Sequence, residues 1–254
     1  MNLSSKNEHI VSKPVALVTG GVRRLGRCIS EHLQRDFRVV AHFCDSSAHA
    51  EELARTHPDI LPMQADLTLP GAPARLIDSV IDVFGELHLL VNNAGLFVND
   101  TTELVQLAKM KTLNVDAPEK LIGAARSHLS RNHGQIINIS DIAGIRPFKL
   151  YKAYSRSKSA ILQFCANHAL ELAKENIRIN TICPGLVLPS ENEQSEKTLA
   201  HLQSQIPLQR MGKAQDVAEL VAFLAHSNFI TGQVICVDGG RLLNSEAKQS
   251  NMSI

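Results

Sequence analysis

Tryptophan is absent from this 254-residue chain, aromatic residues make up only 4% of it, and long apolar runs are missing. No segment approaches the roughly 20 consecutive apolar residues that a membrane-spanning helix needs. The N-terminal segment also carries no apolar stretch of the kind found in a secretory signal peptide. We therefore expect no membrane partner, and we predict a cytoplasmic protein.

Cysteine is scarce and irregularly spaced. The chain has five cysteines, an odd number, and none of them forms a Cys-x-x-Cys pair. Eleven histidines are scattered along the sequence without a convincing pair of metal ligands. This pattern predicts reduced thiols, and it predicts neither a disulfide framework nor a metal site.

An excess of charge of either sign is also missing. The chain has 26 basic and 25 acidic residues, which give a formal net charge of +1. This balance provides no electrostatic reason to expect nucleic acid as a partner. Because 44% of the residues are hydrophobic, a chain of this length can bury a sizeable core. We expect one globular domain that acts on a small-molecule substrate.

Short apolar runs alternate with longer segments of helical periodicity. Strands are predicted at residues 14–19, 37–43, 60–64, 87–92, 135–140, 177–183 and 233–237. Helices are predicted at residues 25–35, 47–56, 74–84, 152–175 and 214–225, with two more within 102–130. The alternation predicts an α/β fold, a single Rossmann-like, doubly wound parallel sheet with helices on both faces.

One domain accounts for residues 14–243 in this scheme. The polar segments on either side, residues 1–13 and 244–254, are expected to be flexible tails. Residues 189–205 are rich in Glu, Gln and Ser and interrupt the alternation, which suits a mobile lid over a substrate site. Ligands of such a sheet bind beyond the carboxyl ends of the strands, so we expect the functional residues there.

A glycine-rich turn follows the first predicted strand and opens the first predicted helix. Gly20 and Gly26 let the backbone approach a phosphate closely, and the N-terminus of the helix attracts negative charge. Arg23 and Arg24 lie at the same N-terminus, next to Leu25, where a cation is unfavourable unless an anion binds. The turn therefore predicts a pyrophosphate site.

Further motifs follow the other strands in order along the chain. They are Asp66-Leu67, Asn92-Asn93-Ala94-Gly95, Asn114, Tyr154-x-x-x-Lys158, Pro184-Gly185 and Val237-Asp238-Gly239-Gly240. Together with the glycine turn, they resemble the pattern of the short-chain dehydrogenase/reductase superfamily over nearly the whole chain. One departure is Arg24, which stands where the superfamily turn has its middle glycine.

The resemblance implies roles for these residues in binding a nicotinamide dinucleotide. Asp66 would accept a hydrogen bond from the adenine amine, with Leu67 beside the ring. Asn93, Ala94 and Gly95 would line the ribose and the sheet edge. Pro184 and Gly185 would face the nicotinamide.

The choice of cofactor depends on the end of the second predicted strand. Enzymes that use NAD place a carboxylate there to bind the ribose 2′-hydroxyl, whereas a basic residue accommodates the 2′-phosphate of NADP. The acid position falls on Phe43, and Arg23 matches the basic residue that NADP-using members carry before the middle glycine. Ser46 supplies a hydroxyl donor, and Asp45 opposes a phosphate if it points inward. We predict NADPH.

Tyr154 and Lys158 are the candidate catalytic residues. They are four positions apart on a predicted helix, so both side chains lie on one face. A free tyrosine has a pKa of about 10, and a nearby ammonium is expected to lower that value and tune the phenol as an acid. By resemblance, Lys158 would also hold the nicotinamide ribose, and Asn114 would fix a water in the proton relay behind the lysine.

Asp141 occupies the position, thirteen residues before Tyr154, where the superfamily has a serine. Ser140 precedes it, and because successive strand residues point to opposite faces, Ser140 is not expected to replace it. Asp141, Arg24 and Phe97 together resemble the pteridine reductase and dihydromonapterin reductase branch, which reduces C=N bonds. By that resemblance, Phe97 would stack on a flat pterin, Arg24 would reach the pyrophosphate and the pterin, and Asp141 and Tyr154 would manage protons.

The prediction is thus an NADPH-dependent reductase that converts a dihydropterin, an oxidised pterin or a folate to the tetrahydro form. Two alternatives stay open. One is a carbonyl reductase such as a 3-oxoacyl-carrier-protein reductase, and the other is a non-catalytic NADP-binding sensor, against which Tyr154 and Lys158 argue. Because the family usually assembles as tetramers, a homotetramer with contacts through residues 152–175 and 233–237 is expected.

Overall fold

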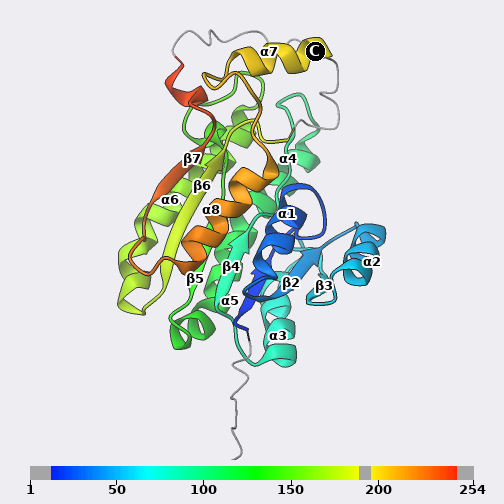
Figure 1. Ribbon diagram of the computed structural model, residues 1–254, viewed down its shortest axis with the longest axis vertical. Coiled ribbons are helices and arrows are strands. Elements are labelled where there is room, and N and C mark those ends of the chain that lie inside the picture. The colour runs from blue at the N-terminus through cyan, green and yellow to red at the C-terminus, as the bar shows by residue number, and fades with distance from the viewer. Residues whose placement is uncertain (1–12, 189–195, 245–254) are drawn as a thin grey trace, which may run out of the picture.

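Seven parallel strands form one sheet in the order β3-β2-β1-β4-β5-β6-β7 (Figure 1). The structure is a computed structural model that describes residues 13–188 and 196–244. The strands are β1 (Val15–Val18), β2 (Arg38–Phe43), β3 (Ile60–Gln64), β4 (Leu89–Asn92), β5 (Gln135–Ile139), β6 (Arg178–Pro184) and β7 (Val234–Val237). Every predicted strand is present, with its ends shifted by no more than two residues. The strand order reverses between β1 and β4, and this switch point places a crevice beyond their carboxyl ends.

The central strands are buried on both faces. Every residue of β1, β4 and β5 is buried, and their sequences VALV, LLVN and QIINI show no alternation of polar and apolar residues. Near-continuous apolar runs are typical of parallel strands that helices cover on both sides. The sequence pattern that predicted buried strands therefore reflects their central place in the sheet.

Two helical layers cover the sheet (Figure 1). One core contains side chains from α1 (Arg24–Leu33), α2 (Ser47–Thr56) and α8 (Ala214–His226). The other core contains side chains from α3 (Ala72–Phe84), α5 (Ala117–Arg131) and α6 (Lys152–Lys174). This arrangement confirms the predicted Rossmann-like, doubly wound fold.

A π-helical turn separates the two helices that were predicted within residues 102–130. α4 (Leu104–Lys111) runs directly into the π turn η1 (Thr112–Asp116), and α5 follows without a break. Such π turns inside longer helices are frequent at functional sites, because the extra residue shifts the helical register. Asn114 lies in the middle of η1, so the shift sets the direction of a predicted site residue.

The predicted lid contains a helix. Residues 196–204 form α7 (Glu196–Ser204), and the side chain of Leu202 on this helix is buried. Residues 189–195 lie outside the described residues, so a mobile lid stays a prediction.

The predicted tails also fall largely outside the described residues, which leave out 1–12 and 245–254. The two tail positions that are described are held by the domain. Lys13 Nζ donates to the carbonyl of Gln34, and Asn244 Nδ2 donates to the carbonyl of Gln205. The flexible tails and the domain bounds therefore stay predictions.

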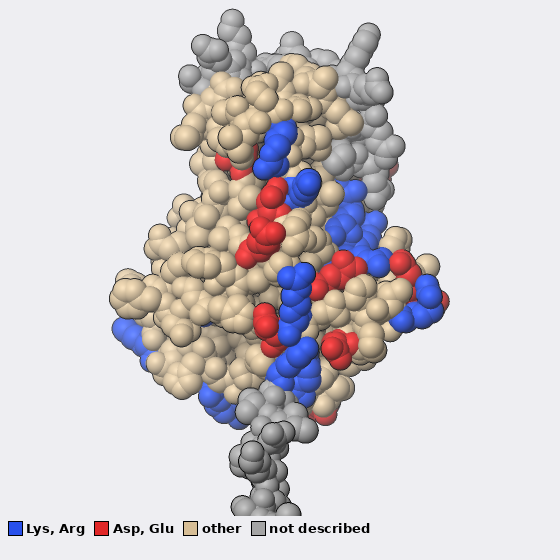
Figure 2. Space-filling model, viewed as in Figure 1, with Lys and Arg blue, Asp and Glu red and all other residues tan. Residues whose placement is uncertain are grey.

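Charged groups of both signs alternate on the face that Figure 2 shows. Arg27 pairs with Glu31 and Glu52, and Arg38 pairs with Glu86. Exposed pairs of this kind contribute at most about 1 kcal/mol each to stability. The pairing on this face matches the balanced composition of the chain.

Candidate active site

The glycine turn between β1 and α1 is packed too tightly for side chains. A Cβ atom built on Gly26 would overlap the carbonyl oxygen of Gly20 and come within 2.6 Å of Asn93 Nδ2. Gly20 has a φ of +63°, in the left-handed region that favours glycine. Asn93 Nδ2 donates to the carbonyls of Thr19 and Gly20. The loop after β4 therefore fixes the turn after β1.

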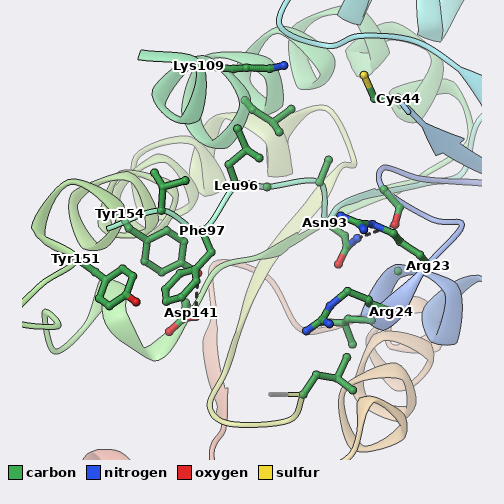
Figure 3. A pocket seen from close by; sticks show the side chains of 18 of the residues that line it. Arg23, Arg24, Cys44, Asn93, Leu96, Phe97, Lys109, Asp141, Tyr151 and Tyr154 are labelled. Atoms are coloured by element: carbon green, nitrogen blue, oxygen red, sulfur yellow. Dashed lines mark hydrogen bonds between the residues drawn. The ribbon is translucent and has the colours of Figure 1, made fainter. Parts of the chain in front are cut away.

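Arg23 and Arg24 give this turn its positive charge. Both side chains line the cleft, and Figure 3 shows them beside Asn93. The first turn of α1 carries no acidic residue. Arg24 has a φ of 51°, a backbone conformation that costs a non-glycine residue of order 1–3 kcal/mol. The backbone at Arg24 is therefore strained, and its guanidinium lies where the superfamily turn described in the sequence has its middle glycine.

A buried histidine that the sequence analysis did not single out braces the same turn. The backbone N–H of Gly20 donates to His42 Nδ1 at 3.2 Å, and His42 Nε2 lies 2.9 Å from the carbonyl oxygen of Ala65. The ring therefore accepts on Nδ1 and donates from Nε2, which is the neutral form. Burial lowers the pKa of His42, and this favours the same form. His42 links the glycine turn to the loop after β3.

Asp66 and Leu67 line the cleft, at the end where the family resemblance implies that the adenosine of the cofactor would lie. The hydroxyl and backbone N–H of Thr68 donate to Asp66 Oδ1 and hold the pKa of that carboxyl below its usual value. Asp45 and Ser46 line the cleft beside Phe43, at the carboxyl end of β2. Asp45 Oδ1 accepts a hydrogen bond from the thiol of Cys44 at 3.4 Å.

Asp141 and Tyr154 meet at the other end of the cleft. The hydroxyl of Tyr154 donates to Asp141 Oδ2 at 2.9 Å, and the backbone N–H of Ala143 donates to Asp141 Oδ1 at 2.7 Å (Figure 3). Ser140 is buried, and its hydroxyl donates to the carbonyl of Lys158. Ser140 is therefore a structural residue of α6 packing, and Asp141 is the strand-end side chain that faces the tyrosine.

Lys158 lies beneath the tyrosine. Its Nζ donates to the carbonyl of Ile139 at 3.1 Å and lies 5.8 Å from the centre of the Tyr154 ring. Burial lowers the pKa of the Lys158 ammonium, and the negative charge of Asp141 works against that change. The pair lies on one face of α6, as its spacing predicted.

The expected lowering of the tyrosine pKa is wrong for this arrangement. Burial raises the pKa of Tyr154 well above 10, and the carboxylate of Asp141 raises it further by its charge and by accepting a hydrogen bond from the phenolic hydroxyl. Burial also raises the pKa of Asp141, although the Ala143 N–H and the Lys158 charge oppose this. The phenol is thus held in its protonated form, next to a carboxyl group that also binds protons more readily than usual.

Asn114 connects the π turn to the strand-four loop. Its Oδ1 accepts from the backbone N–H of Leu96, and its Nδ2 donates to the carbonyl of Leu96 and to Ser157 Oγ. A Cβ atom on Gly95 would lie 3.2 Å from Asn114 Oδ1 and 3.6 Å from Lys158 Nζ. The amide and the ammonium therefore converge behind the loop.

Phe97 lies at the catalytic end of the cleft, packed among tyrosines. Its ring stacks on Tyr151 at a centroid distance of 4.4 Å and an interplanar angle of 11°. It meets the ring of Tyr154 edge-on at 4.7 Å and 86°. Phe97 keeps 42% of its surface exposed and lines the cleft, so it can contact a planar ligand (Figure 3). Tyr151 is a neighbour that the sequence analysis did not identify.

One continuous cleft of about 1200 Å³ joins the glycine turn to Asp141 and Tyr154. Most of the predicted site residues line it: Gly20, Arg23, Arg24, Leu25, Gly26, Ser46, Asp66, Leu67, Asn93, Ala94, Gly95, Phe97, Asp141, Tyr154 and Gly185. Asn114 and Lys158 are buried behind this lining, and Pro184 ends the buried strand β6. The size fits a dinucleotide together with a small substrate.

Several lining residues lie outside every motif of the sequence. They include His42, Lys109, Phe148, Tyr151 and Arg241. Phe148 and Tyr151 come from the segment before α6, and Arg241 begins the 3₁₀ turn η3 (Arg241–Leu243) after β7. A position just after a strand end was a usable signal for Arg241, because it follows the Val237-Asp238-Gly239-Gly240 motif.

The described residues contain neither a group of three or more metal-ligating side chains nor a helix long and apolar enough to cross a membrane.

Comparison with known proteins places the chain among oxidoreductases. A family model described as enoyl-(acyl carrier protein) reductase matches residues 22–241. A tropinone reductase homolog of Arabidopsis thaliana is 33% identical over 249 residues, which cover 92% of this chain and 95% of that protein. L-rhamnose-1-dehydrogenase of Scheffersomyces stipitis is 29% identical over 255 residues, which cover 92% of this chain and 98% of that protein.

Solved structures agree with this placement. A Pseudomonas aeruginosa RhlG/NADP active-site complex has a TM-score of 0.84 and 30% identity, and the match covers 91% of this chain and 97% of that chain. The structure of ElxO with NADP bound has a TM-score of 0.83 and 28% identity, and the match covers 91% of this chain and 99% of that chain.

Proposed function

This chain belongs to the short-chain dehydrogenase/reductase superfamily, and on that premise we propose that it reduces a pterin with NADPH. The coarser activity, an oxidoreductase that uses a nicotinamide dinucleotide, follows from the family. The pterin substrate is the part of the proposal that depends on the residues around Tyr154.

The cofactor site fits NADPH. Gly20 and Gly26 let the turn pack against the loop after β4 with its backbone exposed to a pyrophosphate, and Arg23 supplies a cation for a 2′-phosphate. Phe43 stands where a carboxylate would select NAD, and two structural neighbours were solved with NADP. When bound, NADPH supplies the hydride for the reduction. Gly20, Arg23, Asp66, Asn93 and Lys158 are the residues that would hold it.

The hydrogen bond between Tyr154 and the partly buried carboxyl group of Asp141 is the observation that carries the pterin proposal. Reduction of a ketone builds negative charge on oxygen, and a neighbouring carboxylate repels that charge. A C=N nitrogen is more basic than a carbonyl oxygen and takes up a proton as the hydride arrives, and a carboxylate stabilises the positive charge of that protonated nitrogen. Asp141 therefore favours a C=N substrate, whereas the serine usual in the family favours a carbonyl.

The reaction balances with the residues present. A hydride adds to the ring carbon of the C=N bond, and the electron pair of that bond moves to nitrogen. Tyr154 donates its proton to the nitrogen, and Asp141, whose pKa is raised by burial, can relay a proton from solvent back to the phenolic oxygen. Phe97 offers an aromatic face to the flat heterocycle. The products are a tetrahydropterin and the oxidised dinucleotide.

A carbonyl reductase is the second candidate. The matching family model is described as enoyl-(acyl carrier protein) reductase, and two relatives are named as a tropinone reductase homolog and as L-rhamnose-1-dehydrogenase. A 3-oxoacyl-carrier-protein reductase would fit these names. A non-catalytic NADP sensor is disfavoured because Lys158 and Asn114 converge directly behind the wall of the cleft that Tyr154 lines.

A parallel assay separates these candidates. The purified chain is mixed with NADPH, and the absorbance of the reduced nicotinamide is followed with dihydrobiopterin, dihydrofolate or an acetoacetyl thioester. Turnover of a dihydropterin supports the proposal. Turnover of the thioester alone would replace it with the carbonyl reductase, and NADPH binding without any turnover would favour the sensor.

We further propose a homotetramer with contacts through α6 and β7. Leu170 on α6 is 80% exposed, and Phe229, in the loop between α8 and β7, is fully exposed. These two side chains lie on or next to the elements through which the contacts are proposed, so an interface there would bury them. A second copy of this chain, placed as the family usually places it, would cover both.

A further inference from the structure

Asp100 ties the loop after β4 to the first turn of α6. Its carboxylate oxygens Oδ2 and Oδ1 accept hydrogen bonds from the backbone N–H groups of Lys152 and Ala153, both at 3.0 Å. The backbone N–H of Asp100 also donates to the carbonyl of Leu150 at 2.9 Å. Three hydrogen bonds therefore connect two segments that lie far apart in the sequence.

The carboxylate caps a helix whose own sequence does not cap it. Tyr151 occupies the N-cap position of α6 without a capping hydrogen bond from its side chain, and the first turn carries no acidic residue. The N-terminus of a helix favours a carboxylate, both as a hydrogen-bond acceptor and as a negative charge. Partial burial works to raise the pKa of Asp100, but the N–H groups of Ala153 and Lys152 outweigh it, and the pKa lies below its usual value. Asp100 is therefore ionised at neutral pH.

The two segments that Asp100 joins carry the aromatic side chains of the site. Phe97 lies three residues before Asp100 in the loop after β4, and Tyr151 and Tyr154 lie at the start of α6. The ring of Phe97 stacks on Tyr151 and meets Tyr154 edge-on. The residues on either side of Phe97 pack with Tyr154 in one small core cluster. The spacing between the aromatic wall of the cleft and the proton donor is therefore set where this loop meets the helix.

Asp100 acts from outside the cleft. Its neighbours Asn99 and Thr102 line the cleft, whereas Asp100 is not among the described residues of that lining. Its carboxylate points to the end of the helix instead. An effect of Asp100 on the reaction must therefore pass through the side chains that it places, Phe97 and Tyr154.

We propose that Asp100 is a positioning residue, which holds Phe97 and Tyr154 at the spacing that pterin reduction needs. The inference rests on the proposed function and adds to it a residue outside the cleft. A flat ring stacked on Phe97 must present its C=N nitrogen within hydrogen-bond reach of the Tyr154 hydroxyl. A misplacement of about 1 Å in such an arrangement can lower the rate by about 100-fold.

The tyrosines themselves report this spacing. The chain has two tyrosines and no tryptophan, and both tyrosine rings contact Phe97. Protein made with fluorotyrosine should give one fluorine NMR signal for each, and Tyr151→Phe assigns them. In Asp100→Ala we expect both signals to shift, because the ring of Phe97 moves relative to the two tyrosines.

The same variant tests the reaction. In Asp100→Ala, kcat/KM for dihydrobiopterin should fall by about tenfold or more, because the two groups that act on the pterin lose their alignment. The dissociation constant for NADPH should stay within about twofold of wild type, since the glycine turn is untouched. Asp100→Asn should recover part of the loss, because its amide oxygen still accepts one of the two N–H groups. This variant also provides the test if Asp100→Ala does not fold.

Asp216→Ala is the matched control for a general loss of stability. Asp216 Oδ2 accepts a hydrogen bond from the backbone N–H of Lys213 at 2.7 Å and caps α8, which packs in the other helical layer. This variant should lower the melting temperature much as Asp100→Ala does, with tyrosine signals and kcat/KM close to wild type. Equal changes in the two variants would overturn the inference, and so would wild-type tyrosine signals in Asp100→Ala.

Failure of the inference can be told apart from failure of the proposed function. Reduction of dihydrobiopterin by Asp100→Ala at the wild-type kcat/KM would overturn the role of Asp100 alone. If the wild type reduces no pterin, the proposed function fails, and the tyrosine signals decide on Asp100. Shifted signals in Asp100→Ala with unchanged signals in Asp216→Ala then support its positioning role, and any other pattern overturns it.

Discussion

Tyr154 is surrounded by groups that keep its proton in place. Burial and the carboxylate of Asp141 raise the pKa of the phenol, so the protonated form prevails at neutral pH. A proton donor of this kind is useful when the acceptor is a strongly basic nitrogen formed during the reaction. The lysine beneath it holds the ring from one side, and the carboxyl group of Asp141 directs the hydroxyl from the other.

Replacement of Tyr154 by phenylalanine removes the proton donor and leaves the cleft otherwise intact. We expect kcat to fall by about 100-fold or more, the usual contribution of a positioned general acid. The dissociation constant for NADPH, measured by fluorescence titration, should change little. A variant Tyr154→Phe that retains the wild-type kcat would disprove the proton-donor role.

His42 is expected to act through its acceptor nitrogen. His42→Asn keeps an acceptor near the position of Nδ1 for the Gly20 N–H, whereas His42→Gln keeps a donor near Nε2 for the Ala65 carbonyl. Titration of each variant should show NADPH binding close to wild type for His42→Asn and roughly tenfold weaker binding for His42→Gln. The reverse order would show that the link to Ala65, and not the link to Gly20, positions the turn.

The same histidine predicts a pH effect on stability. Burial lowers its pKa below 6.5, and the nearby charge of Asp66 only partly opposes this. A depressed pKa contributes stability above the unfolded pKa, and that stability is lost as the pH falls through the folded value. Denaturant unfolding should therefore show wild type losing more stability than His42→Asn between neutral and mildly acidic pH. Parallel losses in the two proteins would contradict this.

Sequence reasoning found the residues that belong to ordered motifs. Asp141, Tyr154 and Lys158 have fixed spacings, and the structure brings them together. It did not find His42, because its role depends on contacts between segments far apart in the sequence. His42 reaches the turn after β1 and the loop after β3, and neither contact leaves a periodic pattern. The direction in which the pKa of Tyr154 is shifted could not be predicted from the sequence either, because it depends on how deeply the side chain is buried.

At the scale of elements, the glycine turn and α1 must meet without intervening side chains. In Gly26→Ala the new methyl group would overlap the Gly20 carbonyl, so we expect a loss of about 1–3 kcal/mol in the free energy of unfolding and weaker NADPH binding. Gly123→Ala is the matched control, because a Cβ atom there meets nothing within 4 Å. That exposed helical position should gain up to about 1 kcal/mol. Equal effects of the two substitutions in denaturant unfolding would contradict the packing argument.

The ends of some helices were predicted correctly from the sequence, whereas two helical segments were missed. α2 was predicted with its observed ends, Ser47 and Thr56. The π turn η1 was missed, because a single extra residue in a helix leaves the apolar periodicity on both sides nearly unchanged. α7 was missed because its sequence is polar, and the buried side chain of Leu202 on this helix packs at the cleft, which no local pattern reveals.

At the scale of the whole molecule, the proposed homotetramer predicts which apolar side chains matter. Leu170→Asp places a charge on the exposed face of α6 and should lower the average mass measured by analytical ultracentrifugation. Val83→Asp is the control, because Val83 is also exposed but lies on α3, away from both proposed contacts. A wild-type chain that sediments as a monomer would contradict the proposed assembly.

The fold as a whole was accessible from the sequence because parallel strands buried on both faces leave near-continuous apolar runs. The substrate was less accessible, because the same sheet supports carbonyl and C=N reduction. Only the side chains beyond the strand ends distinguish the two, and among them the carboxyl group of Asp141 makes the decisive difference in charge.

The most direct test of the account is the substitution Asp141→Ser, assayed with dihydrobiopterin and with an acetoacetyl thioester. It replaces the carboxyl group beside Tyr154 with the hydroxyl that is usual in the superfamily. We predict that kcat/KM for the dihydropterin falls by about 100-fold, while any activity with the thioester is unchanged or rises. Dihydropterin reduction at the wild-type rate in this variant would contradict the central role of the Asp141–Tyr154 pair.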